Sequence, residues 1–569
     1  MTPKHFNCLL IADFTVDPLA HFLQDRSSEP WVKCEIAPID QVKQTLQDQG
    51  HECWRQKPDL TVIWSQPWRQ IAGFAQFVSA ETADLGSIKK EVSEFSAYIR
   101  LASSLSHIVF VPSWTLPSYY RGEGILDYKN SIGIYNTLMR MNLQLADELE
   151  DCENVYILNT QQWMSAAART EDDRMWYLGK ILFSRELFRQ AAEEMKAGMQ
   201  TIYGNAKKLL VLDLDNTLWG GIIGDAGVDG IKLGVNDPIG EAFIEFQRHI
   251  RILKNRGILL AIASKNDEEV ALEVFEKHPE MILKKEDFVA WRINWDDKAK
   301  NIVDLAAELN LGLQSVVFID DNPAERARVA EALPEVTVPD WPEDPVSYPR
   351  ELLRLRCFDK VSTSQEDRQR TTFYLNEKRR QEMLQAVPSL EDWLQTINLK
   401  VIYEDLSSSN VSRAVQLLNR VNQFNLVTRR MDKNEFFKLA QEGDRKVWVF
   451  YASDRIGDYG MIGLTSCEID DRCLRIRDFI LSCRAMGRGI EKAMLSLIAA
   501  FARINHAHKI VGQYIRTAKN APCAEFLPDN GFKSSGNGFE LVNLNAIQVP
   551  SYIRLEAKDA ELNSFISPN

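Results

Sequence analysis

The sequence has few cysteines for its length, and none of them has the paired spacing of a metal-binding or redox motif. Nine cysteines are scattered over 569 residues without a C-x-x-C pair. Neither a structural zinc site nor a disulfide framework is therefore indicated. This pattern leaves open that a single cysteine acts as a reactive thiol.

Long apolar runs are also missing. No uninterrupted apolar stretch reaches the roughly 18–20 residues that a membrane-spanning helix needs. The first residues, MTPKHFNCLLIADF, lack a signal-peptide hydrophobic region followed by a small-residue cleavage site. We therefore expect a cytoplasmic protein that does not bind a membrane.

Acidic residues outnumber basic ones over the whole chain, 80 to 67, but positive charge is locally concentrated. The net charge of −13 argues against general nucleic-acid binding. Between Asp470 and Asn520, however, Lys and Arg outnumber Asp and Glu by ten to four. This basic segment indicates a local anionic ligand, such as a phosphate or pyrophosphate, and a solvated basic face is the alternative.

The chain is too long for one core, and its 45% hydrophobic and 26% charged residues are typical of soluble globular domains. In residues 1–200, short apolar runs alternate with helix-length segments, which predicts a parallel sheet covered by helices. A second alternating series predicts another doubly wound domain over residues 205–341. The expected strands are Cys8–Ala12, Leu60–Trp64, His107–Val111 and Val155–Leu158, then Lys208–Leu212, Ile258–Ala263, Ser315–Ile319 and Glu335–Val338.

The second half of the chain has a different pattern. Residues 342–395 open with a proline cluster and continue as a charged helical pattern, which predicts a helical linker. Residues 396–556 contain four strand-like runs, and a helix is expected from Gly489 to Asn505. Residues 557–569 have no pattern and are interpreted as a tail. The whole chain is thus expected to be an α/β multidomain protein with an α+β domain near its end.

Two carboxylates follow an expected strand in the run VLDLDNTLWGG. Asp213 and Asp215 come directly after Lys208–Leu212, and ligands of open α/β sheets bind outside the carboxyl ends of strands. Two carboxylates in one crevice repel each other unless a cation lies between them, so Mg²⁺ is implied. One carboxylate can then attack a phosphate while the other protonates the leaving group. The pair predicts phosphoryl transfer.

Further polar residues follow the later strands in order. Ser264 closes the run ILLAIAS, where a hydroxyl can hold a phosphoryl oxygen. Lys298 opens the next helix and can offset phosphate charge, and Asp320 and Asp321 close the run SVVFID on the metal side of the crevice. The order D-x-D-x-T, Ser, Lys and DD resembles the haloacid-dehalogenase (HAD) superfamily.

The HAD resemblance implies a role for each residue. Asp213 would be the nucleophile that forms an aspartyl-phosphate, and Asp215 the general acid and base. Mg²⁺ would be bound by Asp213, the Asp215 carbonyl and Asp320, with Asp321 as a further candidate ligand. Thr217, Ser264 and Lys298 would lie around the phosphate. The sequence separations from Asp215 to Ser264 and from Ser264 to Lys298 are short. They leave room for a flap but not for a cap domain, so we expect an open site that depends on another domain to exclude water.

A glycine-rich loop follows an expected strand near the C-terminus. The run CRAMGRGIEKAMLSLI places Arg484, Gly487, Arg488 and Gly489 at a helix N-terminus, where main-chain N–H groups bind anions. This region resembles a GNAT acyltransferase domain, which implies that the loop holds the pyrophosphate of coenzyme A or the phosphopantetheine arm of an acyl carrier protein. A strand-helix turn without a ligand is the alternative.

Cys483 lies directly before this loop. A thiol at a helix N-terminus beside Arg484 and Arg488 is expected to have a lowered pKa and to act as a nucleophile. The alternative is a small buried residue at the end of a strand. Cys467, Cys473 and Cys523 are weaker candidates because no comparable positive setting surrounds them.

The first domain resembles the SGNH-hydrolase fold without its catalytic pattern. Thr15 follows the first strand, but there is no Gly-Asp-Ser, and Asp172 and Asp173 have no histidine where the hydrolase base should lie. An active Ser-His-Asp site is therefore not expected. A docking or substrate-screening domain is favoured.

The order of these parts, together with RVNQFNLVTRRM at Arg420–Met431, resembles the FkbH-like family. This resemblance implies a glyceryl transferase/phosphatase that takes a glyceryl unit from 1,3-bisphosphoglycerate, removes phosphate and loads the unit as a thioester onto an acyl carrier protein for polyketide biosynthesis. One alternative is a small-molecule phosphatase fused to a CoA-dependent N-acetyltransferase. The other is a carrier-protein-binding scaffold with a phosphatase domain.

Overall fold

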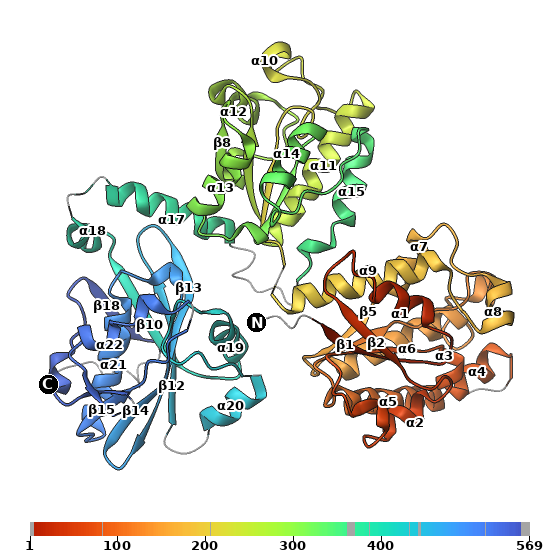
Figure 1. Ribbon diagram of the computed structural model, residues 1–569, viewed down its shortest axis with the longest axis horizontal. Helices are drawn as coiled ribbons and strands as arrows, with labels where there is room; N and C mark the ends of the chain where they lie inside the picture. The colour runs from red at the N-terminus through yellow and green to blue at the C-terminus, as the bar shows by residue number, and fades with distance from the viewer. Residues whose placement is uncertain are drawn as a thin grey trace. The chain divides into compact units, whose positions relative to one another are not determined.

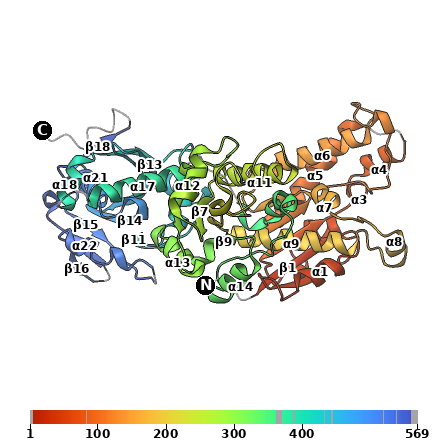
Figure 2. The same ribbon diagram turned by 90° about the horizontal axis from the view of Figure 1, so that it is seen from above.

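The computed structural model describes residues 5–81, 84–204, 206–360, 370–385, 387, 389–431, 433–441, 445–517, 519–536 and 538–558. It contains three sheets with helices around them (Figures 1 and 2), which confirms the α/β multidomain class. In this part of the chain, no helix is both long and apolar enough to cross a bilayer.

The first sheet is parallel and has the strand order β2-β1-β3-β4-β5. Its strands are β1 (Phe6–Ala12), β2 (Val32–Ile36), β3 (Leu60–Trp64), β4 (Ile108–Pro112) and β5 (Val155–Leu158). Its helices are α1 (Asp17–Leu23), α2 (Val42–Gln47), α3 (Pro67–Gln70), α4 (Ala72–Val78), α5 (Leu85–Ser103), α6 (Ile134–Leu149), α7 (Thr160–Ala166), α8 (Asp173–Gly179) and α9 (Arg185–Ile202).

Both faces of this sheet are buried by helices. Residues of α1 and α9 pack on one face, and residues of α4, α5 and α6 pack on the other (Figure 1). Strands buried on both faces are apolar throughout, as in LTVIW of β3. The expected strands of this domain are found within two residues of their predicted bounds. The edge strand β2 was missed because Lys33 and Glu35 interrupt its apolar pattern.

The second sheet has the order β8-β7-β6-β9. Its strands are β6 (Leu209–Leu212), β7 (Leu259–Ser264), β8 (Phe288–Ile293) and β9 (Val316–Ile319). The helices around it are α10 (Ile223–Ala226), α11 (Pro238–Asn255), α12 (Glu268–Lys277), α13 (Lys298–Glu308) and α14 (Pro323–Ala332). Strand β8 was not predicted, and the expected strand Glu335–Val338 is reduced to one bridge, between Val317 and Thr337.

Most of the described residues of the predicted linker are helical, and the linker itself stays a prediction. It contains α15 (Tyr348–Arg354), α17 (Arg370–Gln385) and α18 (Leu390–Thr396), and residues 361–369, 386 and 388 lie outside the described residues. The predicted tail, 557–569, is described only through residue 558.

The third sheet is mixed and runs in the order β16-β17-β15-β14-β13-β12-β10-β18, with β11 paired to β14. Its strands are β10 (Leu399–Asp405), β11 (Phe424–Asn425), β12 (Arg445–Ser453), β13 (Asp458–Asp470), β14 (Cys473–Leu481), β15 (Lys509–Gly512), β16 (Lys533–Ser535), β17 (Gly538–Leu541) and β18 (Ile553–Ala557). Its helices are α19 (Val411–Arg420), α20 (Lys433–Gln441), α21 (Ile490–Ile504) and α22 (Phe526–Asp529). Residues of α21 join the larger core of this domain, and residues of α19 and α20 pack in a second cluster (Figure 1).

The chain forms two compact units. The first contains Met1–His249, Ala263–Asn266 and Trp295–Thr363, and the second contains Ile250–Ile262, Asp267–Asn294 and Ser364–Asn569. The five predicted segments stay a prediction, although each sheet falls almost wholly within one of them. All the residues predicted for phosphoryl transfer belong to the first unit.

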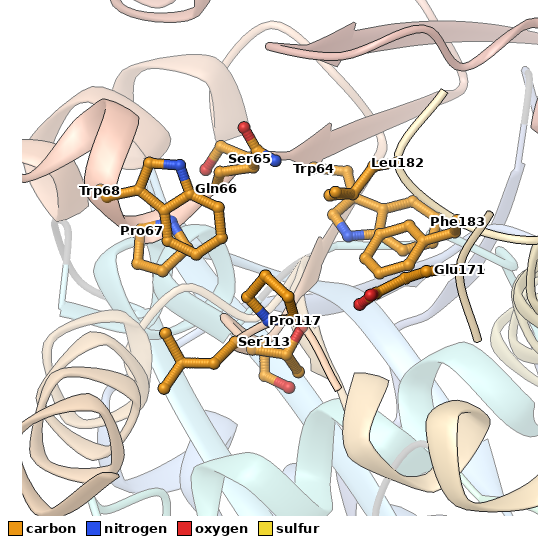
Figure 3. Close-up of a pocket in the computed structure, with 12 residues that line it drawn as sticks. Trp64, Ser65, Gln66, Pro67, Trp68, Ser113, Pro117, Glu171, Leu182 and Phe183 are labelled. Atoms are coloured by element: carbon orange, nitrogen blue, oxygen red, sulfur yellow. The ribbon is translucent and has the colours of Figure 1, made fainter. Parts of the chain in front are cut away.

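A small pocket lies at the carboxyl ends of β3 and β4 in the first domain (Figure 3). It is separate from the residues predicted to carry phosphoryl transfer, none of which lines it.

A buried ion pair fixes α17 to the third sheet. The guanidinium of Arg380 donates to both carboxylate oxygens of Asp454, at 2.8 and 3.1 Å, and lies over the ring of Tyr459. The Tyr459 hydroxyl donates to the same carboxylate at 2.7 Å. Both charged side chains are almost completely buried, so neither can exchange its partner for water.

Replacing Arg380 by Met should therefore leave the Asp454 charge unpaired in the interior and lower the stability of this region by roughly 3 kcal/mol or more. Native-state hydrogen exchange of β12 and β13 measures the loss. Arg379→Met, at the exposed neighbouring position, is the control and should change exchange little. Equal exchange in both variants would contradict the structural role of this pair.

Candidate functional site

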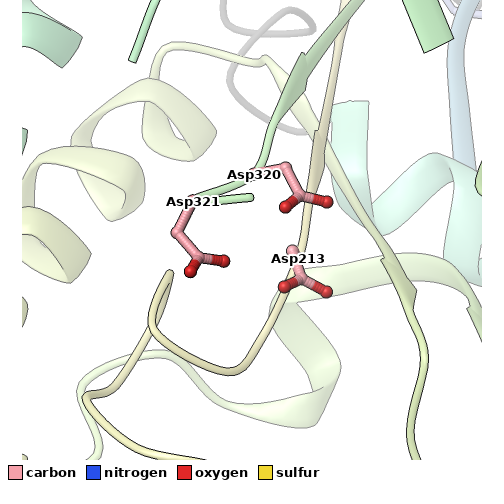
Figure 4. A group of neighbouring side chains, drawn as sticks. All are labelled: Asp213, Asp320 and Asp321. Carbon is pink, nitrogen blue, oxygen red and sulfur yellow. The ribbon is translucent and has the colours of Figure 1, made fainter. Parts of the chain in front are cut away.

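Three carboxylates meet at the carboxyl edge of the second sheet. Asp213 follows β6, and Asp320 and Asp321 follow its parallel neighbour β9. The backbone N–H of Asp213 donates to the Ile319 carbonyl at 3.0 Å, which keeps the two strand ends in register. Each residue offers a carboxylate oxygen within 4.8 Å of the others (Figure 4). The structure thus brings these three predicted residues together.

Lys298 binds two of these carboxylates. Its Nζ lies 2.8 Å from Asp213 Oδ1 and 2.6 Å from Asp320 Oδ2. The side chain is buried. Lys298 is the first residue of α13, which Asp297 caps by accepting from the N–H groups of Ala299 and Lys300. Burial lowers the pKa of Lys298, but the charges of Asp213 and Asp320 outweigh this effect and raise it. Lys298 is therefore a fixed positive charge at neutral pH.

The cluster still has an excess of negative charge. The pKa of Asp320 and of Asp321 is raised to about 6. Burial is the larger cause and the charge of Asp213 the second, whereas Lys298 opposes the rise. Three ionised carboxylates and one ammonium group leave two negative charges. Grouped carboxylate oxygens are the ligands that Mg²⁺ prefers, so these residues fit a divalent cation in donor type and in charge.

Asp215 has a different set of partners. Its Oδ1 accepts from Trp219 Nε1 at 2.9 Å and from the Ile223 N–H at 3.1 Å, and its Oδ2 accepts from Asn266 Nδ2 at 3.0 Å. Burial raises the pKa of Asp215 despite these donors. A raised pKa suits a carboxyl group that must carry a proton before it can donate one.

Ser264 and Thr217 have positioning contacts. Ser264 is buried at the end of β7, and its Oγ accepts from Asn266 Nδ2 at 3.3 Å. Thr217 is fully buried, and its Oγ1 accepts from the Asp321 N–H at 3.2 Å. The Thr217 hydroxyl therefore holds the Asp321 loop, and its predicted role toward phosphate stays a prediction.

Sequence reasoning missed Asn266 and Trp219. Both were visible in the sequence, two residues after Ser264 and four after Asp215. Their side chains carry no catalytic group of their own, so only the geometry shows that they hold Asp215.

The loop after Asp215 forms a short flap. Asn216 has a left-handed backbone (φ 53°), and its Oδ1 accepts from the Gly221 N–H at 2.8 Å. Gly220 pairs with Lys232 through reciprocal backbone hydrogen bonds, and α10 lies between them. No inserted domain lies among these described residues, and the predicted open site stays a prediction.

The predicted anion loop of the C-terminal domain adopts the expected strand-loop-helix course. Gly487 and Gly489 both have φ 75°, and Gly489 is the N-cap of α21. A Cβ at Gly489 would lie 2.4 Å from the hydroxyl oxygen of Tyr552. Glycine is therefore required at this position both by its backbone conformation and by its close neighbour.

The arginines of this loop contact their own domain. Arg488 is only 7% exposed, donates to Glu377 Oε1 at 2.5 Å and to the Arg484 carbonyl, and lies over the ring of Tyr459. Arg484 lies over the ring of Phe373. These contacts hold the loop in place, and the predicted roles of both arginines toward phosphopantetheine stay predictions.

Cys483 is the first residue of a 3₁₀ turn, Cys483–Ala485, that follows β14. Its side chain lies outside the described part of the structure, so its predicted role as a nucleophile stays a prediction.

The segment Arg420–Met431 supplies β11. Phe424 and Asn425 pair with the carboxyl end of β14, and the Leu426 carbonyl accepts from the Ile515 N–H at 2.8 Å. Strand β15 pairs with β14 only from Cys473 to Arg475. This segment therefore lies beside the half of β14 that leads into the predicted anion loop.

Two residues considered for hydrolase chemistry in the first domain have structural hydrogen bonds, and the predicted lack of this chemistry stays a prediction. Thr15 Oγ1 donates to the Gly179 carbonyl at 2.5 Å. Asp172 caps α8 by accepting from the Arg174 N–H. Both side chains thus have structural partners, and the SGNH-like assignment stays a prediction.

The raised pKa values of Asp320 and Asp321 generate a prediction about stability. Their folded-state pKa of about 6 lies above the ordinary value of 3.8, so the folded protein holds the extra protons. This contribution favours folding below about pH 4 and is lost as the pH rises through about 6. Mg²⁺ should relieve the repulsion, and it should raise the melting temperature more at pH 7.5 than at pH 5.

Thermal denaturation with and without Mg²⁺ at both pH values measures this difference. In Asp320→Asn/Asp321→Asn the stabilisation by Mg²⁺ should disappear, whereas Asp229→Asn, on the exposed part of the flap, should behave like the wild type. An equal effect of Mg²⁺ at both pH values, or in the double variant, would contradict the assignment of these ligands.

Comparison with known proteins finds matches among solved structures only. No protein-family model matches the chain, and no curated protein matches it. Two acetyltransferase structures match about a quarter of it: a spermidine N-acetyltransferase from Vibrio cholerae in complex with CoA and spermine (13% identity, TM-score 0.21, 26% of this chain and 98% of that one) and the ribosomal-protein-S18-alanine N-acetyltransferase from Escherichia coli (11% identity, TM-score 0.20, 25% and 89%). Scores this low carry no argument about this chain.

The larger match is to the crystal structure of the N-terminal part of the protein BF1531 from Bacteroides fragilis, which contains a phosphatase domain complexed with Mg. It covers 63% of this chain and 95% of that chain, at 30% identity and a TM-score of 0.57. This chain therefore belongs to the same family as the phosphatase-domain part of BF1531.

Proposed function

We propose that this protein is a glyceryl transferase/phosphatase. It takes a glyceryl unit from 1,3-bisphosphoglycerate, dephosphorylates it and loads it as a thioester onto an acyl carrier protein for polyketide biosynthesis. The observation that carries the phosphatase step is the cluster of Asp213, Asp320 and Asp321 around Lys298, with Asp215 held apart from it. The family relationship to a phosphatase domain supports the same step. The acyl-transfer step rests on the resemblance of the sequence to the FkbH-like family.

The phosphatase step uses two aspartates in different states. A carboxylate oxygen of Asp213 attacks the phosphorus of the C3 phosphate, and the bond between phosphorus and the substrate oxygen breaks. Asp215 donates a proton to that leaving oxygen, and afterwards takes a proton from the water that hydrolyses the aspartyl-phosphate. Lys298 keeps Asp213 in position and offsets the charge of the phosphate. Bound Mg²⁺ would supply the remaining positive charge, held by Asp213, Asp320 and Asp321.

The transfer step uses an acyl phosphate as its electrophile. The Cys483 thiolate would attack C1 of the glyceryl group, and the bond from C1 to the phosphate oxygen would break with release of phosphate. The phosphopantetheine thiol would then displace Cys483 and carry the unit as a thioester. The short flap beside Asp213 would leave room for a substrate borne by another protein.

A second function is favoured by the contacts of Arg488. Its guanidinium is buried and bound to Glu377, so the C-terminal domain could act as a binding module for a carrier protein while the phosphatase site works alone. Cys483→Ser separates the two functions: glyceryl loading stops if the domain transfers the acyl group, and it is unchanged if the domain only binds.

Replacing Asp213 by Asn should abolish dephosphorylation, because the amide is not a nucleophile toward phosphorus. The variant should accumulate a phosphorylated acyl species on this chain or on the carrier protein. Intact-protein mass spectrometry after incubation with 1,3-bisphosphoglycerate, Mg²⁺ and holo-carrier protein detects it. Asp229→Asn is the control, and normal glyceryl-carrier output from Asp213→Asn would overturn the assignment.

Replacing Asp215 by Asn should slow the first phosphoryl transfer according to the leaving group. An alkyl phosphate needs a proton on its leaving oxygen, so its rate of phosphoryl transfer should fall about a hundredfold or more. The rate with p-nitrophenyl phosphate should fall far less. Asn266→Leu should show the same preference to a smaller extent, because it removes one hydrogen bond that holds Asp215. Single-turnover rates with both substrates measure this. Equal losses on both would contradict the role of Asp215 as an acid.

A further inference from the structure

Helix α8, at the periphery of the first domain (Figures 1 and 2), turns most of its apolar side chains toward solvent. No residue of this helix is buried, and Tyr177 and Leu178 are 79% and 83% exposed. Trp176 is half-buried and packs against the core of the first domain. Tyr177 and Leu178 follow Arg174 at the spacing i, i+3 and i+4, so these three side chains share one face of the helix. Covering the apolar part of such a face stabilises a complex.

The position of α8 is fixed although the helix buries so little. Asp172 caps it by accepting from the Arg174 N–H at 3.1 Å. At the other end, the Lys180 carbonyl accepts from the Thr15 N–H at 2.9 Å, and the Lys180 ammonium lies 5.0 Å from the centre of the Trp176 ring. A helix of seven residues is unstable in water by itself, so these contacts hold α8 with its exposed face outward.

A loop that is bound to the segment before α8 carries further exposed apolar side chains. The N–H of Ser118 donates to the Glu171 carboxylate at 3.0 Å. The next residue, Tyr119, is exposed, and the loop continues through Ile125, which is 98% exposed, and Tyr128. Single exposed apolar side chains are common, but several large ones on one helix and its neighbouring loop are typical of an interaction site. Tyrosine is also enriched at protein interfaces.

The exposed charges of these two segments are mainly basic. In residues 118–143 and 169–180 the exposed acids are Glu123 and Asp173, and the other three acids accept hydrogen bonds from backbone N–H groups. The exposed bases are Arg121, Lys129, Arg140, Arg169, Arg174 and Lys180. This positive surface lies on a chain whose net charge is −13. It is complementary to an acidic partner, whereas a two-fold contact with the same surface of a second copy would bring its bases together.

The backbone of α8 also restricts the kind of partner. The hydrogen bonds of a helix are internal, so α8 offers side chains and no free strand edge for an extended peptide. Aliphatic side chains such as Leu178 and Ile125 give no stacking platform for nucleic-acid bases, which need aromatic rings. An amphipathic helix has an apolar stripe flanked by polar or charged residues. An acidic helix of this type matches both the apolar face of α8 and the basic residues of the two segments.

We propose that α8 and residues 118–132 form the docking surface for an acidic amphipathic helix of a partner protein. The apolar stripe of that helix covers Tyr177, Leu178 and Tyr119, and its acidic residues pair with the bases of the two segments. The identification of this partner as the acyl carrier protein rests on the proposed function. Docking here uses none of the residues assigned to phosphoryl or acyl transfer, so binding and catalysis are measured separately.

Fluorescence anisotropy of two labelled peptides with the full chain tests the docking surface. Both are stapled helical peptides of about 18 residues with the same stripe of leucines, and the other positions carry Glu in one peptide and Lys in the other. The Glu peptide should bind saturably, and the Lys peptide should bind at least roughly tenfold more weakly. Tyr177→Ser/Leu178→Ser should weaken binding of the Glu peptide by roughly tenfold or more, because it removes the central apolar contacts. Leu353→Ser, at an exposed position on α15, is the control and should bind as the wild type does.

Neither substituted side chain is buried, so the double variant should keep the wild-type melting temperature, and the comparison of the two peptides on the wild type needs no variant. Equal binding of both peptides, or unchanged binding of the Glu peptide by the double variant, overturns the proposal. The same holds if phosphatidylglycerol vesicles or oligouridylate bind the wild type and not the double variant, or if the wild type forms a dimer that the double variant loses.

The kinetics of glyceryl loading test the carrier protein as the partner. In the double variant the KM for holo-carrier protein should rise roughly tenfold, while kcat and the hydrolysis of p-nitrophenyl phosphate stay unchanged, because the reacting groups are intact. An unchanged KM would overturn the carrier protein as the partner. If the wild type loads no glyceryl unit, the proposed function fails, and the two peptides still decide whether the docking surface exists.

Discussion

The candidate phosphoryl-transfer site depends on one buried lysine between two buried aspartates. Lys298 lies 2.8 Å from Asp213 and 2.6 Å from Asp320, and the two aspartates end neighbouring parallel strands. Without this ammonium group, the carboxylates at the edge of the sheet would repel one another in a region that water does not screen. With it, Asp213 has a cationic partner at the strand end, and the three carboxylates still outnumber this one ammonium group, as a divalent cation site requires.

The fold keeps Asp215 chemically distinct from this cluster. Asp213 and Asp215 are separated by a single residue, yet Asp215 is bound by Trp219, Asn266 and a backbone N–H, whereas Asp213 is bound by Lys298. Two carboxyl groups with different surroundings can serve as nucleophile and acid in one reaction. The flap that starts at Asn216 contributes the Ile223 N–H to this arrangement, so it helps to hold Asp215 in place.

Much of this arrangement could be predicted from the sequence because the strands are buried and apolar and the polar residues follow them. The strands that carry Asp213, Ser264 and Asp320 were placed within one residue of their observed ends. The strand β8 was missed because Trp291 and Arg292 make FVAWRI resemble an amphipathic segment, and β2 was missed because it is a half-exposed edge. The contacts of Asn266 and the inward contacts of Arg488 depend on side-chain directions that no spacing encodes. The domain boundaries and the role of Cys483 stay predictions.

The central claim is that Asp213 is the nucleophile of a phosphatase in this family. It is tested most directly by acid-quenching the wild-type protein during turnover of 1,3-bisphosphoglycerate with Mg²⁺ and locating the phosphoryl group by peptide mass spectrometry. The account predicts a transient phosphoryl group on Asp213, which disappears as inorganic phosphate is released. A phosphoryl group on another residue, or phosphate release without any phosphorylated aspartate, would contradict it.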